Sequence, residues 1–90
     1  MIKTIDPKFG HALCKLRKSA GLKLRVFART AKVSPAWMSY VETGKRIPTW
    51  EFVEVCAGTL KAKKIPTDKI KRFKILGQKI VFQKTFGRVS

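Results

Sequence analysis

The chain has 90 residues, 44% of them hydrophobic, and its 21 Lys and Arg against 5 Asp and Glu give a formal net charge of +16. This length allows one domain with a modest core and excludes an enzyme with a separate substrate domain, while the hydrophobic content excludes overall disorder. So high a charge indicates a polyanionic partner, nucleic acid first and an anionic membrane second, with a merely basic soluble surface as the weaker alternative.

The two cysteines and the single histidine form no metal-binding pattern. Cys14 and Cys56 lie far apart among apolar neighbours, which indicates buried free thiols, and His11 has no second ligand nearby. No stretch approaches the ~20 apolar residues of a membrane span, and the start, MIKTIDPKFG, lacks the apolar core of a signal peptide. We expect a soluble intracellular protein that uses no metal or cofactor and does not bind membranes.

The first predicted helix spans about residues 7–20. Asp6 can cap its start, Pro7 suits the first helical position, and Gly21 can adopt the positive φ that ends a helix. Apolar residues recur at steps of three and four and form one stripe, made of Phe9, Leu13, Leu16 and Ala20.

Two short helices joined by a tight turn follow, at about residues 24–31 and 35–43. The second has the clearer boundaries, because Ser34 is a favourable N-cap, Pro35 suits the first helical position and Gly44 can end the helix. The residues expected to face inward are Phe27, Ala28, Ala31, Met38 and Val41.

Two further helices and a basic C-terminal segment complete the prediction. Thr49 caps a helix over about residues 50–60, and Thr67 or Asp68 caps another that ends near Leu76, before Gly77. Their buried residues are expected to be Trp50, Val53, Ala57, Leu60, Ile70, Phe73 and Leu76. Residues 79–86 alternate in a way that suits a strand, with a helical continuation as the alternative. The predicted fold is therefore all-α, a compact bundle of about five helices with a short C-terminal strand or extended arm.

The predicted elements follow the helix-turn-helix layout, whose second helix enters the major groove of DNA. Their order is a helix, a three-residue turn, a capped helix, a glycine, a basic loop and a proline. Residues 16–60 resemble the lambda-repressor-like family, the Cro and repressor (XRE-type) regulators of phages and bacteria. The matching residues are Leu16, Arg17, Gly21, Leu22, Ala28, Val33, Ser34, Met38, Val41, Glu42, Gly44, Lys45, Arg46 and Pro48. Two residues depart from the pattern: Leu24 stands where a polar phosphate-binding residue is common, and Lys32 where glycine is preferred in the turn.

The resemblance implies a DNA-binding domain over residues 1–76, with the motif at about 24–43, and an arm over 77–90. It also implies an ion pair between Arg17 and Glu42, against the alternative of two unrelated surface charges. Cations flanking the second helix are expected to bind phosphate, although each alone could be a solvated side chain. The candidate phosphate-binding residues are Arg17, Lys23, Arg25, Arg29, Ser34, Lys45 and Arg46.

By position in the family, bases would be read by Pro35, Ala36, Trp37, Ser39 and Tyr40. The side chains that usually recognise guanine and adenine, Arg, Asn and Gln, are missing from this set. We therefore expect contacts to thymine methyl groups, single hydroxyl hydrogen bonds and recognition of DNA shape. Trp37 is open to two interpretations, a contact to the DNA backbone or a place in the core.

The leading function is a repressor that binds double-stranded DNA as a homodimer on an inverted repeat, in the cytoplasm of a bacterial or phage-infected cell, at the nucleoid. Residues 79–86 could pair across the dimer or pack on their own domain. Alternatives are an antitoxin-like autoregulator that binds a partner protein and an RNA-binding regulator that uses the basic, Phe-containing tail. An enzyme is disfavoured, because the sequence has no nucleophile–base pattern, no Walker-type loop and no metal-binding carboxylate pair.

Overall fold

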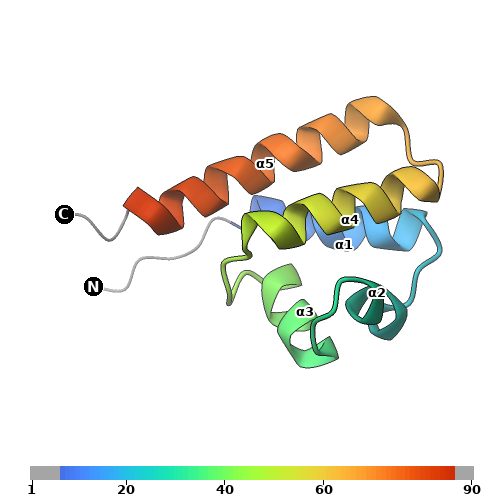
Figure 1. Cartoon of the computed structure of the whole chain (residues 1–90), viewed down its shortest axis with the longest axis horizontal. Helices are drawn as coiled ribbons and strands as arrows, with labels where there is room; N and C mark the ends of the chain where they lie inside the picture. The colour runs from blue at the N-terminus through green and yellow to red at the C-terminus, as the bar shows by residue number, and fades with distance from the viewer. Residues whose placement is uncertain (1–6, 87–90) are drawn as a thin grey trace.

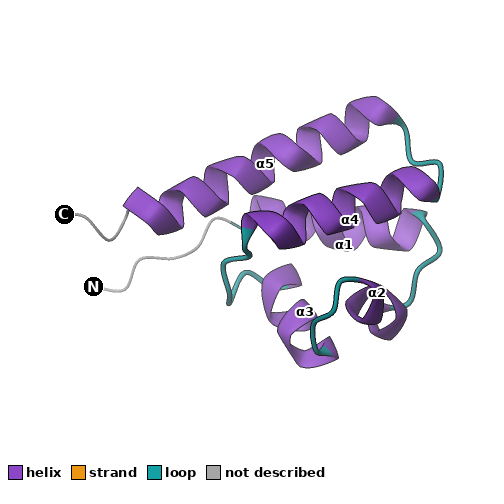
Figure 2. Ribbon diagram, viewed as in Figure 1, coloured by secondary structure: helices purple, strands orange, loops and turns teal. Residues whose placement is uncertain are grey.

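All the regular structure of the chain is helical in the computed structural model, which describes the backbone of residues 7–86 and the side chains of residues 7–82. The helices are α1 (Lys8–Ser19), α2 (Leu24–Thr30), α3 (Pro35–Glu42), α4 (Trp50–Ala62) and α5 (Thr67–Phe86). In Figure 1, α4 crosses in front of α1, α5 runs along one side of this pair, and α2 and α3 lie on the other. Turns and loops make all the connections within residues 7–86 (Figure 2). The all-α fold is thus confirmed.

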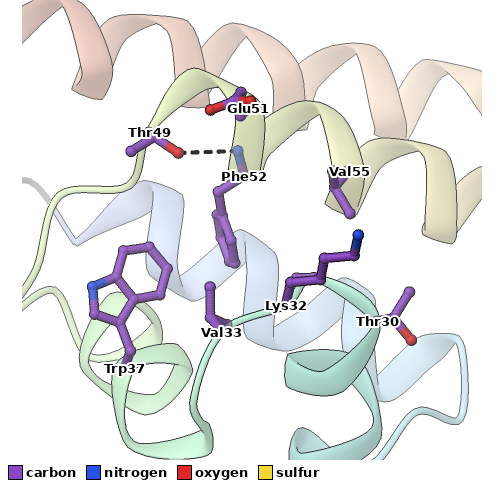
Figure 3. Close-up of a pocket in the computed structure, with 9 residues that line it drawn as sticks. Thr30, Lys32, Val33, Trp37, Thr49, Glu51, Phe52 and Val55 are labelled. Carbon is purple, nitrogen blue, oxygen red and sulfur yellow. Dashed lines mark hydrogen bonds between the residues drawn. The ribbon is translucent and has the colours of Figure 1, made fainter.

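Local capping signals set most of the helix boundaries. Ser34 Oγ accepts a hydrogen bond from the Trp37 backbone N–H at 3.1 Å, and Thr49 Oγ1 accepts one from the Phe52 N–H at 3.1 Å (Figure 3). Gly21 has a φ of 72° and Gly44 a φ of 80°, conformations that glycine adopts without steric cost. The predicted ends of α1 and α3 are therefore confirmed, whereas the predicted cap Asp6 lies outside the described residues.

The core is shared by every helix. The largest fully buried side chains include Phe9, Leu13, Phe27, Met38, Leu60 and Phe73. The rings of Phe9 on α1 and Phe73 on α5 stack with their centroids 5.0 Å apart. Cys56 is fully buried and burial raises the pKa of its thiol, but Cys14 is only half-buried, so the expectation of two buried thiols holds for one of them.

α5 does not end at Gly77, and the prediction of an extended segment over residues 79–86 is wrong, because the helix continues to Phe86. Gly77 is buried inside the helix, where an added Cβ would lie 2.7 Å from Cγ1 of Val53 and 3.1 Å from the ring of Phe9. Glycine is needed there for close packing against α4 and α1, rather than for a helix stop. Ile80 is also buried, so this part of the tail packs on its own domain.

The predicted buried stripe of α4 is wrong at its first residue. Trp50 is 36% exposed, whereas Phe52 is 4% exposed. The reason is that α4 packs against α5 on one side and contacts α2 on the other, so its buried arc is wider than one stripe and is displaced from Trp50. The other expected core positions of α4, Val53, Ala57 and Leu60, are buried.

Gly10 brings α1 into direct contact with the backbone of α3. A Cβ added to this buried glycine would meet the carbonyl oxygens of Val41 and Glu42 and would lie 2.9 Å from the carbonyl carbon of Glu42. A glycine inside a helix gives no such signal in the sequence, because its role depends on a residue more than 30 positions away. The C-terminal end of α3 is therefore positioned by main-chain packing.

We expect Gly10→Ala to lower the free energy of unfolding by about 2–3 kcal/mol, because the methyl group must displace backbone atoms of α3. Urea denaturation measures this. Gly58→Ala is the matched control: Gly58 is exposed, with no atom within 4 Å of an added Cβ, and should gain about 0.5–1 kcal/mol from helix propensity. Equal stability of the two variants would contradict this account of α1 and α3.

Candidate nucleic-acid interface

α2 and α3 are joined by a tight turn that contains Lys32 at the position where the family resemblance prefers glycine. Lys32 has a φ of 60°, a left-handed conformation that costs a lysine some strain. The Val33 N–H donates to the Ala28 carbonyl at 3.0 Å, and the Ala28 side chain is fully buried. Figure 3 shows the Lys32 side chain extended toward Val55 on α4.

Arg17 on α1 and Glu42 at the end of α3 form a buried ion pair, as the sequence predicts. Arg17 Nε donates to Glu42 Oε2 at 2.7 Å and Nη2 donates to Oε1 at 3.2 Å, while the side chains are 11% and 7% exposed. Nη1 donates to the Leu22 carbonyl at 2.9 Å, so one guanidinium joins α1, α3 and the loop before α2. The hydrogen bonds that Arg17 donates to the Glu42 carboxylate raise the pKa of the guanidinium above its ordinary value.

This arrangement favours a structural role for Arg17 over the expected phosphate contact. Each of its three guanidinium nitrogens has an acceptor within the protein, and Nη2 makes a fourth contact, to the Cys14 sulfur at 3.8 Å. The residue as a whole is only 9% exposed. A phosphate would have to displace part of this network to reach it.

α3 presents a small exposed surface beside its buried side. Pro35, Ala36 and Tyr40 are exposed, and Ser39 is half-buried. Met38 and Val41, on the opposite side, are at most 1% exposed. Of the five side chains expected to read bases, three are therefore exposed, and Ser39 and Trp37 are half-buried.

Trp37 faces the core rather than projecting with its neighbours. Its ring meets that of Phe52 edge-on, with centroids 5.0 Å apart, and the indole is half-buried (Figure 3). The structure therefore supports the packing interpretation of Trp37, in which the tryptophan fixes the distance between α3 and α4.

Cations lie at both ends of α3. Arg25 and Arg29 on α2 are exposed and line a shallow recess of about 470 Å³ together with Val33 and Pro35, at the start of α3. Lys23, also exposed, occupies the N-cap position of α2.

At the other end of α3, the backbone N–H groups of Lys45 and Arg46 donate to the Tyr40 carbonyl at 2.7 and 3.2 Å. The basic loop is therefore tied to the helix that carries the candidate base-reading residues. Ser34, also predicted to bind phosphate, uses its hydroxyl oxygen to cap α3. Its exposed O–H can still donate to an anion.

Other kinds of site have little support within the described part of the chain. Residues 7–82 contain no group of three or more His, Cys, Asp or Glu side chains that could hold a metal ion. None of the described helices combines the length and the apolar character needed to cross a membrane. The basic surface around α3 is thus the best-supported site.

Comparison with known proteins agrees with this geometry. A family model described as a helix-turn-helix domain matches residues 8–68. Among solved structures, the chain is similar to the clp gene regulator ClgR from Corynebacterium glutamicum, with 26% sequence identity and a TM-score of 0.60 over 90% of this chain and 84% of that chain. The search of curated proteins gave no match.

We expect Glu42→Ala to lower the free energy of unfolding by about 3 kcal/mol, because it leaves the Arg17 guanidinium buried without its counterion. In the double variant Arg17→Met/Glu42→Ala the loss should be smaller than the sum of the single losses by at least about 1 kcal/mol. Chemical denaturation of the four proteins measures this coupling. Lys18→Ala, an exposed position on α1, is the control and should change stability by less than about 0.5 kcal/mol. Additive losses would contradict the pairing.

Proposed function

The chain belongs to the helix-turn-helix domain family, and from this membership we propose that it is a sequence-specific regulator of transcription that binds double-stranded DNA. The similarity to a clp gene regulator over 90% of the chain supports a regulatory role.

The observation that carries the proposal is the position of α3 between two groups of exposed cations. Arg25 and Arg29 lie at its start, and Lys45 and Arg46 are hydrogen-bonded to its last turn. A helix laid in the major groove has phosphates along both edges, so cations at both ends can bind the backbone while the exposed side of the helix meets base edges. The net charge of +16 supports strong, salt-dependent affinity.

We propose that bases are read mainly through apolar and hydroxyl contacts. Pro35 and Ala36 suit thymine methyl groups, and Ser39 and Tyr40 can each donate or accept a hydrogen bond. Trp37 supports this surface from behind by packing on Phe52. Because no bidentate side chain is available on α3, much of the selectivity would come from the shape and deformability of the DNA.

The finer proposal is a repressor that binds as a two-fold dimer to an inverted repeat in the bacterial cytoplasm. One short recognition helix reads few base pairs, so two copies about 34 Å apart, one helical turn of DNA, would supply the needed affinity and specificity. A protein that covers its site excludes other proteins from the same DNA, which makes repression the simplest outcome of binding.

Selection of bound sites from random duplex DNA, followed by sequencing, tests the proposal. We expect enrichment of an inverted repeat whose half-sites are one turn apart. Competition by single-stranded RNA at equal salt is the control for non-specific binding of a basic protein. No enrichment of any sequence, or preferential competition by RNA, would overturn a sequence-specific role.

Removal of a phosphate-binding charge should weaken binding to all duplexes alike. For Lys45→Gln or Arg46→Gln we expect the slope of log affinity against log salt to fall by about 0.9 for each charge removed, with unchanged sequence preference. Fluorescence anisotropy over a range of salt concentrations measures the slope. Lys71→Gln is the matched control and should change the slope less, because Lys71 is an exposed cation of α5, the helix on the opposite side of the α1–α4 pair from α3 (Figure 1).

Changes on the exposed side of α3 should alter sequence preference instead. We expect Ala36→Gly to reduce discrimination for thymine at one position of each half-site, because it removes a methyl–methyl contact. We expect Tyr40→Phe to reduce base discrimination at a different position, because it removes the hydroxyl group that can form a hydrogen bond. Binding to all single-base variants of the selected site measures this, with an expected loss of about 1 kcal/mol of discrimination at the affected base. If both protein variants discriminate among the single-base DNA variants as the unaltered chain does, Ala36 and Tyr40 do not contact bases.

A further inference from the structure

The outward side of α4 has a composition unlike the rest of the surface. In Figure 1 α4 lies in front of α1, and no other helix lies in front of α4. The exposed residues of α4 are Trp50, Glu51, Glu54, Val55, Gly58, Lys61 and Ala62, and we name the last six the α4 outer face. They fall on one arc because they recur at steps of three and four along the helix.

Gly58, at the middle of this face, has no explanation within a single copy of the chain. Glycine is the least favourable helix-interior residue after proline, because it lacks a side chain and gains most freedom on unfolding. The interior glycines Gly10 and Gly77 are accounted for by close contacts with other helices, whereas a Cβ added to Gly58 would meet no atom within 4 Å. Beside it Val55 is 43% exposed, a large side chain next to an empty position.

The charges of the α4 outer face are arranged along the helix axis. Two acidic residues, Glu51 and Glu54, lie in its first half, and Lys61 lies at its other end. Neither carboxylate forms an ion pair with a described residue, although the chain carries 21 Lys and Arg. Within residues 7–82 the only other exposed acidic residue is Asp68. Carboxylates make this face unsuited to the DNA backbone and suited to a surface that presents a cation opposite them.

We propose that the α4 outer face is a two-fold interface between two copies of this chain, in which the α4 helices pack antiparallel. A symmetry axis that crosses α4 midway between Val55 and Gly58 sets Val55 of each copy over Gly58 of the other. The same axis brings Glu51 within one helical turn of Lys61 of the second copy, at both ends of the contact. One face thus supplies the projecting and the empty position, and both signs of charge, which is what an isologous interface requires.

This inference rests on the proposed two-fold dimer and supplies its interface. The face contains none of the exposed residues of α3 and neither Lys45 nor Arg46, although Glu51 and Val55 also line a recess with Lys32, Val33 and Trp37. One helix pair is a small contact and two copies of charge +16 repel each other, so the association should be weak in solution and increase with salt.

Charge reversal across the axis is the first test. Sedimentation velocity without DNA, at about 0.3 M salt, where the screening length is shorter than about 8 Å, should give a monomer–dimer equilibrium for the unaltered chain. Glu51→Lys and Lys61→Glu should each weaken association at least about tenfold, because like charges then face each other. The double variant Glu51→Lys/Lys61→Glu restores opposite charges at both ends and should recover association to within about threefold.

Two control variants separate the contact from general charge effects. Asp68→Lys changes the net charge as Glu51→Lys does, and Lys71→Glu changes it as Lys61→Glu does, but both positions are exposed residues of α5. We expect each control to alter association less than about threefold, an effect of net charge alone. Equal losses in the controls and in the α4 variants would overturn the interface.

Filling the empty position is the second test. Gly58→Gln has open space in the monomer and a better helix propensity, so its melting temperature at low concentration should not fall. Its association should nevertheless weaken at least about tenfold, because the new side chain occupies the place of Val55 from the second copy. A dimer that still forms in Gly58→Gln would overturn the interface. Ile75→Glu is the control on α5, where Ile75 is 51% exposed, and loss of the dimer in this variant would also overturn the interface.

The outcomes for interface and function are distinct. A chain that is monomeric at millimolar concentration, or that forms a dimer insensitive to every α4 variant, overturns the interface even if the chain binds its selected DNA. A dimer with the expected α4 dependence supports the interface even if no DNA sequence is enriched, in which case the proposed function fails alone.

Discussion

The buried pair of Arg17 and Glu42 is the interaction on which the rest of the structure depends. It joins the first helix to the last residue of α3, and its third guanidinium bond, to the Leu22 carbonyl, fixes the loop that leads into α2. A buried ion pair of this kind contributes little net stability over an apolar substitute, but loss of one partner is costly. Its main effect is therefore to specify where the helix-turn-helix lies against α1.

Main-chain contacts around glycine complete this positioning. Gly10 lets α1 touch the carbonyl groups at the end of α3, and Gly77 lets α5 lie against Val53 and Phe9. Both helices that flank the core thus approach their neighbours more closely than a residue with a Cβ allows. α3 is therefore positioned by backbone contacts with α1 and by the packing of Trp37 on Phe52, and its exposed residues take no part in these contacts.

This arrangement is consistent with the proposed role in DNA recognition of a helix that lacks Arg, Asn and Gln. Affinity would come from the exposed cations on either side of α3, which need only charge and reach. The helix itself offers Ala36, Ser39 and Tyr40 at a fixed distance and angle, and a rigidly held apolar surface suits methyl groups and groove shape. The outer side of α4, where we propose that a second copy binds, contains none of these three residues.

The sequence by itself determined the local structure: Ser34 and Thr49 cap α3 and α4 through bonds that span three residues, and Gly44 follows α3 with a positive φ. The Arg17–Glu42 pair was also accessible, through the family pattern. Tertiary structure alone decided whether Gly77 ends a helix or fits between two others, and whether Trp37 faces DNA or Phe52. Capping depends on neighbours in the chain, whereas these choices depend on which helices pass nearby, and periodicity carries no information about that.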